Sequence, residues 1–159
     1  MDIFQEEYDR LEEALRRLRQ DSNAKAVFLI DKNGQHIAMA GDTGEFDSTS
    51  LASLTAGNVA ATDGLAKLIG EREFSVLFHE GQRDHIHISI VARRAILLVI
   101  FDERSSLGLV RLRVKRASAE LEKVFDEMTA KSEHGGMGVA EVSPFSEITD
   151  EDIDALFSD

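Results

Sequence analysis

Cysteine is absent from this chain of 159 residues, which excludes a disulfide framework and catalysis by a thiolate. Also absent is any run of about 18 apolar residues, the length that a helix needs to span a membrane. The N-terminal sequence MDIFQEEYDR is acidic and amphipathic, whereas a signal peptide is basic and then apolar. We therefore expect a cytoplasmic protein with no signal peptide and no membrane span.

Positive charge is scarce, because 18 Lys and Arg face 30 Asp and Glu and the net charge is −12. A nucleic-acid-binding protein needs a basic footprint, so this class is excluded. The acids are unevenly placed: residues 133–159 contain eight Asp or Glu and no Lys or Arg. We expect this acidic tail to be separate from the body of the protein.

No catalytic motif is present. The chain lacks the G-x-x-x-x-G-K-[ST] loop of phosphate-binding nucleotidases. His85 and His87 could hold zinc if another ligand joined them, but two histidines on the polar side of an amphipathic strand are the simpler interpretation. Arg93 and Arg94 could pair with phosphate, although adjacent arginines at a strand turn are usually solvated. We predict no active site, no metal and no cofactor.

The apolar periodicity predicts an α+β sandwich. Residues 2–20 and 105–128 repeat apolar side chains at spacings of three and four, which indicates helices. Residues 26–30 are predicted to form one strand. A second strand is predicted to follow an Asn33-Gly34 turn and to end at residue 40. The runs FSVLFHE, HIHISIVA and AILLVIFD read as an antiparallel meander, in which His85, His87 and Ser89 mark a wetter face. With a helix over 47–70, the order α-β-β-α-β-β-β-α predicts a five-stranded antiparallel sheet carrying helices on its faces.

We divide the chain into a domain over 1–131, a flexible linker over 132–145 and an acidic tail over 146–159. The linker contains three glycines and the single proline. In the tail, Thr149 and Asp152 resemble a capping box that opens a short amphipathic helix. The apolar face of this helix is predicted to dock on a partner: Ile153, Leu156 and Phe157. The alternative is a tail that only solvates the protein.

The helix over 47–70 contains Gly57 and Gly64, each of which costs about 1 kcal/mol relative to Ala. Asp47 or Ser48 is expected to cap its start, and Gly70 to follow its end. On a helical wheel one arc is predicted to face the core: Leu51, Leu54, Ala61, Leu65, Leu68 and Ile69. The adjoining arc is small and uncharged until Lys67 closes it: Ser53, Ala56, Gly57, Ala60, Gly64 and Lys67. We predict that this small-residue arc is an interface, the alternative being contact with another element of the same subunit.

Three stretches, VFLIDKNGQ, SLASLTAGNVAA and SLGLVRLRVKRA, together with the order of elements, resemble the roadblock/dynein-light-chain family over residues 1–130. The resemblance implies a homodimer in which the two sheets join and the second helices lie side by side. It further implies a regulator that binds a small Ras-like GTPase and activates hydrolysis without an inserted arginine, by holding the GTPase's own catalytic loops. The small-residue arc would face the GTPase, and the tail helix would contact it at a second place and modulate nucleotide exchange.

Two other functions stay open. A roadblock domain can serve as a scaffold that binds a GTPase without changing hydrolysis, and related sandwich folds act as sensors of small ligands. A GTPase titration separates the regulator from the scaffold. A sensor would instead show a ligand-dependent melting temperature with no GTPase present.

Overall fold

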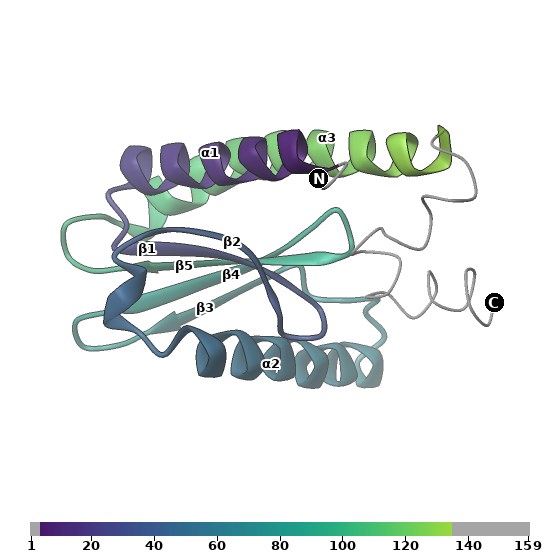
Figure 1. The fold of residues 1–159 in the computed structure, drawn as a ribbon. Coiled ribbons are helices and arrows are strands. Elements are labelled where there is room, and N and C mark those ends of the chain that lie inside the picture. Colours follow the sequence, from purple (N-terminus) through teal and green to yellow (C-terminus); the bar gives the residue numbers. More distant parts are fainter. Residues whose placement is uncertain (1–3, 135–159) are drawn as a thin grey trace.

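The computed structural model describes residues 4–134, which form one five-stranded antiparallel sheet between two helical layers (Figure 1). The elements follow in the order α1 (Gln5–Ser22), β1 (Ala26–Asp31), β2 (His36–Gly41), the 3₁₀ turn η1 (Thr43–Glu45), α2 (Ser48–Leu68), β3 (Val76–Glu80), β4 (His85–Val91), β5 (Ala95–Phe101) and α3 (Leu107–His134). The strand order across the sheet is β2-β1-β5-β4-β3. The predicted fold class is confirmed.

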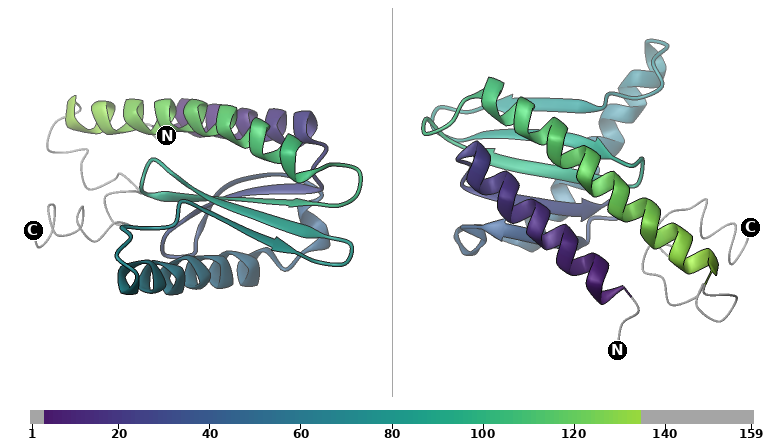
Figure 2. Two further views of the ribbon diagram at one scale, coloured as in Figure 1. Left: turned by 180° about the vertical axis from the view of Figure 1, so that it is seen from behind. Right: turned by 90° about the horizontal axis from the view of Figure 1, so that it is seen from above.

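The helices α1 and α3 lie side by side on one face of the sheet, and α2 covers the other (Figures 1 and 2). The central strands β1 and β5 are buried along their whole length, because both of their faces are covered. The apolar stripe of α3 packs on the sheet as its periodicity predicts: Val110, Val114, Ala117, Leu121, Val124 and Met128 are buried. Burial of such stripes is the main stabilising contribution to this fold.

Ion pairs link α1 to α3. Arg17 Nη2 lies 2.6 Å from Glu120 Oε2, Arg10 forms a salt bridge with Glu127, and Lys131 Nζ lies 3.2 Å from Glu7 Oε1. The hydrogen bond from Arg10 lowers the pKa of Glu127. Pairs as exposed as the first two contribute little stability, so they fix the register of the two helices more than they hold them together.

The turn between β1 and β2 supports α2. The Asp31 side chain accepts hydrogen bonds from the backbone N–H groups of Asn33 (2.8 Å) and Gln35 (3.0 Å). Gly34 has a φ of +91°, and a Cβ added there would lie 3.2 Å from Ser53 Cα. The predicted Asn33-Gly34 turn is confirmed, and it packs directly under α2.

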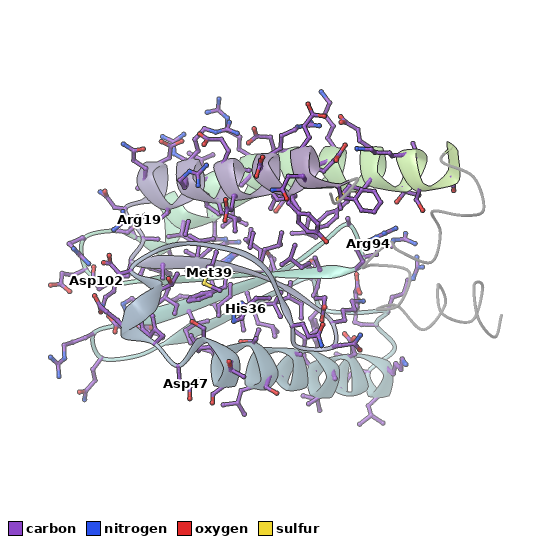
Figure 3. The ribbon with its side chains drawn as sticks, in the orientation of Figure 1. Arg19, His36, Met39, Asp47, Arg94 and Asp102 are labelled. Carbon is purple, nitrogen blue, oxygen red and sulfur yellow. The ribbon has the colours of Figure 1, made fainter. Side chains whose placement is uncertain are left out.

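Both ends of α2 have the predicted caps. Asp47 accepts hydrogen bonds from the Ser50 hydroxyl at 2.8 Å and from the Ser50 N–H at 3.2 Å. These two bonds, the hydroxyl bond above all, lower the pKa of Asp47. His36 Nε2 on β2 lies 2.7 Å from the Ser48 carbonyl oxygen, so the start of the helix is fixed to the sheet (Figure 3). At the other end Gly70 adopts a φ of +85°, and Glu71 N–H donates to the Ala66 carbonyl at 2.8 Å, which is the Schellman arrangement.

One face of β4 differs from the prediction. His87 and Ser89 were expected on a wetter face, but they are 2% and 5% exposed. The reason is that α3 covers this face and the edge strand β3 flanks it. Alternation of apolar and polar residues shows that a strand has two different faces, but it does not show which element covers each face. Burial, and secondarily the charge of Arg111, lowers the pKa of His87.

The buried His87 predicts a loss of stability in mild acid. Because its folded pKa lies below the unfolded value of about 6.5, the unfolded chain binds the additional proton as the pH falls below about 6.5, and the free energy of unfolding decreases. We expect His87→Gln to reduce the loss measured by urea unfolding at pH 7.5 and 5.5. The exposed His79→Gln serves as the control, and an unchanged loss in His87→Gln would contradict the prediction.

Candidate partner-binding surface

The small-residue arc lies open on α2. Ser53, Gly57, Ala60, Gly64 and Lys67 are exposed, and Ala56 is half-buried. A Cβ added at Gly57 or Gly64 would meet no atom within 4 Å. Packing within residues 4–134 therefore does not require either glycine, and no element of that part of the chain covers them.

The predicted core-facing arc of α2 is wrong. Leu54 is 73% exposed, Leu65 60%, Leu68 83% and Ile69 68%; Ala61 is also exposed, and Leu51 is half-buried. The side chains that α2 buries are smaller: Ala52, Thr55, Val59 and Ala66. The physical reason is that large side chains of the strands, among them Phe28, Ile96 and Leu98, already fill this layer, so only small helical side chains fit against them.

Two surfaces therefore adjoin on α2. The small-residue arc borders the turn between β1 and β2, as the contact of Gly34 with Ser53 and Ala56 shows. The exposed apolar residues, here named the apolar arc, are Leu54, Ala61, Leu65, Leu68 and Ile69. On a helical wheel they occupy the strip next to the small-residue arc and away from the buried side chains of α2. An exposed set of large apolar side chains on a protein of this size indicates an interface.

The strand β3 lies at one edge of the sheet. It pairs only with β4 among residues 4–134, and its Val76 and Phe78 are 49% and 37% exposed. An apolar edge strand with an unpaired backbone is prone to pair with another chain. Phe78 stacks on Phe101 of the core beneath α1 and α3, so Val76 and Phe78 lie on the face of the sheet opposite to α2. The edge of β3 and the apolar arc are therefore two separate apolar surfaces that a second copy could cover.

The side chains considered for chemistry do not form a site in the described part of the chain. His85 Nδ1 accepts a hydrogen bond from Gly81 N–H at 3.2 Å, and His87 is buried under α3. No group of three or more His, Cys, Asp or Glu that could hold a metal occurs within residues 4–134. Arg93 occupies a left-handed position in the tight turn between β4 and β5, and Arg94 lies at the opposite end of the sheet from Asp102 (Figure 3).

The tail residues Ile153, Leu156 and Phe157 lie outside the described residues, as do the tail and most of the predicted linker. Their docking role stays a prediction. Within residues 4–134, no helix combines the length and the apolar character that crossing a bilayer requires.

Residues 10–101 match the family model of the Roadblock/LC7 domain, and the chain belongs to this family. Among solved structures it is similar to MglB of Myxococcus xanthus, with 57% identity and a TM-score of 0.75 over 80% of this chain and 96% of that one. It is also similar to the gliding protein MglB of Thermus thermophilus, with 35% identity and a TM-score of 0.72 over 76% and 92% of the two chains. A third structure, of MglB in a tetrameric arrangement, shares 34% identity and a TM-score of 0.71 over 76% and 91%. A comparison with curated protein sequences found no match.

Proposed function

We propose that this protein is an MglB-type regulator of a small Ras-like GTPase of the MglA type, and that it accelerates GTP hydrolysis as a homodimer. The observation that carries the proposal is the small-residue arc, which is exposed and whose glycines no packing within residues 4–134 requires. The similarity to two MglB structures at 57% and 35% identity supports it. On this proposal the protein acts in cell polarity and motility, in the cytoplasm and concentrated at a cell pole.

The arc suits the positioning of another protein's loops. Its side chains are short, so the backbone of a GTPase loop can approach the helix closely and be held in one conformation. From Leu51 to Leu68 the helix carries only Asp63 and Lys67 as charged residues, so docking desolvates little charge. The chain supplies shape and the GTPase supplies the catalytic groups, which is why the regulator needs no active site.

The test is the rate of GTP hydrolysis by the MglA-type GTPase with and without this protein. The proposal expects acceleration that saturates with the regulator. Binding without acceleration would instead identify a scaffold. On the same proposal, removal of residues 146–159 should alter nucleotide exchange by the GTPase while stimulation of hydrolysis persists.

If the protein acts by holding the GTPase's own catalytic loops, no arginine of this chain should enter the active site of the GTPase. Arg104 already pairs with Asp102 at 3.0 Å, and Arg93 and Arg94 belong to the turn between β4 and β5. Replacing each of the three with Ala should leave most of the acceleration, since an arginine finger is worth roughly 10³–10⁵ in rate. A thousandfold loss in one variant, with the affinity for the GTPase unchanged, would contradict the mechanism.

A further inference from the structure

The first half of α3 concentrates positive charge in an acidic protein. Residues 107–119 contain Arg111, Arg113, Lys115 and Arg116 and no Asp or Glu. None of these four side chains forms a salt bridge within residues 4–134. The arginines of the neighbouring α1 behave differently: Arg10, Arg16, Arg17 and Arg19 all pair with carboxylates. Four cations on α3 therefore lack the partners that their counterparts on α1 have.

An apolar seam runs between these cations on the outer surface of α3. Leu112 is 60% exposed at its centre, and the exposed Gly108 and Ala119 lie on the same side of the helix. A Cβ added at Gly108 would meet no atom within 4 Å. We name as the basic α3 face the residues Gly108, Arg111, Leu112, Lys115, Arg116 and Ala119. A small apolar seam with basic borders is complementary to an acidic amphipathic helix, whose apolar stripe can pack on the seam while its carboxylates face the cations.

We propose that the basic α3 face binds the acidic tail of the same chain, residues 146–159. This segment contains six carboxylate side chains and no Lys or Arg, and its apolar residues Ile153, Leu156 and Phe157 recur at helical spacing. Its charge and its apolar stripe both complement the face. The net charge of −12 repels a polyanion from solution, whereas the tail is covalently attached and always nearby.

The tether is long enough. At about 1.5 Å of rise per residue, Ala119 lies about 22 Å and Leu112 about 33 Å before the last residue of α3, His134. Extended at about 3.3 Å per residue, the segment 135–147 reaches roughly 43 Å. A short tether gives an effective concentration on the order of millimolar, so even individually weak, salt-sensitive ion pairs suffice for contact.

The contact would keep the apolar side of the tail off other proteins until a competitor displaces it. This contact does not depend on the proposed GTPase, because the basic α3 face and the tail both belong to this chain. The absence of native cysteine allows a direct test by disulfide trapping. In the full chain, Ala119→Cys on the basic α3 face is combined with Ser158→Cys in the tail, and oxidation is followed on a non-reducing gel.

The matched control is Gln20→Cys with Ser158→Cys. Gln20 is exposed at the end of α1, close to the start of α3, where Ser105 donates a hydrogen bond to the Ser22 carbonyl. We expect the intramolecular disulfide of the Ala119→Cys variant to form at least tenfold faster than that of the control. Lys115→Glu with Arg116→Glu should lower the rate to the control value, and Asp152→Lys with Asp154→Lys in that background should restore it.

Equal rates for the two cysteine pairs would overturn the proposal. So would a covalent dimer formed by the Ala119→Cys and Ser158→Cys variant, because the face would then hold the tail of a neighbouring copy. A third outcome is that this variant closes its disulfide no faster than the control while the parent binds phosphatidylserine vesicles. If Lys115→Glu with Arg116→Glu abolishes that vesicle binding, the basic α3 face binds an anionic membrane surface and not the tail.

Discussion

Ala60→Arg and Gly64→Arg should each strongly weaken binding of the GTPase and leave the melting temperature of the protein close to that of the parent. Both positions are exposed on α2, and the space around Gly64 is open beyond 4 Å from an added Cβ. The fold therefore has room for the longer side chain. In a close contact, however, the guanidinium would lose its hydration without gaining a partner, which costs about 2–5 kcal/mol or more.

That cost corresponds to a loss of affinity of about 30-fold to several thousandfold. The measurement is the dissociation constant for the GTPase beside a thermal melt of each variant. The matched control is Gly44→Arg, the same substitution at an equally open glycine in η1, outside both the small-residue arc and the basic α3 face, and it should bind normally. If both α2 variants melt like the parent and still bind, the small-residue arc is not the docking surface.

A milder change isolates the role of the glycines. Gly57→Ala and Gly64→Ala remove the helix penalty of glycine and should each raise the free energy of unfolding by up to about 1 kcal/mol, because nothing in residues 4–134 opposes the added methyl group. If the glycines serve close approach, the same variants should bind the GTPase more weakly. A gain of stability with unchanged affinity would leave these glycines without a role in docking.

Periodicity predicted the parts of the fold in which one stripe of large apolar residues meets one surface. The helices α1 and α3 each carry such a stripe, and its residues Leu11, Leu15 and Leu121 are completely buried. The ends of α2 were predictable for another reason. Capping by Asp47 and the left-handed Gly70 is decided by a few neighbouring residues, so no knowledge of tertiary structure is needed.

The faces of α2 could not be assigned by the same argument. This helix has large apolar residues on one side and small residues on the others. The helical wheel predicts that the large residues face the core. In the structure the sheet accepts Ala52 and Ala66, while Leu65 and Leu68 face outward. A surface that another molecule covers has the same apolar composition as a core. The sequence of one chain therefore does not distinguish a core-facing side of a helix from an interface. The corrected expectation is that Leu65→Ala costs far less than the roughly 2–5 kcal/mol of a buried leucine.

Leu65→Asp should convert the protein from a dimer to a monomer. We propose that the apolar arc and the edge of β3 meet their counterparts in a second copy. Burying a leucine is worth roughly 1.5–3 kcal/mol, and at a two-fold interface one substitution acts twice. The dissociation constant should therefore rise by about 10²–10⁴-fold. Light scattering at micromolar concentration should report a mass near 17.6 kDa for the variant and about twice that for the parent.

The chain offers a close control for this result. Leu112 on α3 is 60% exposed, the same as Leu65, but it lies in the opposite helical layer (Figure 2). Leu112→Asp makes the same chemical change at the same exposure, so it should remain a dimer. Because neither leucine is buried in the subunit, both variants should fold, and far-UV circular dichroism can verify this. A Leu65→Asp variant that still scatters as a dimer would show that α2 does not form the interface.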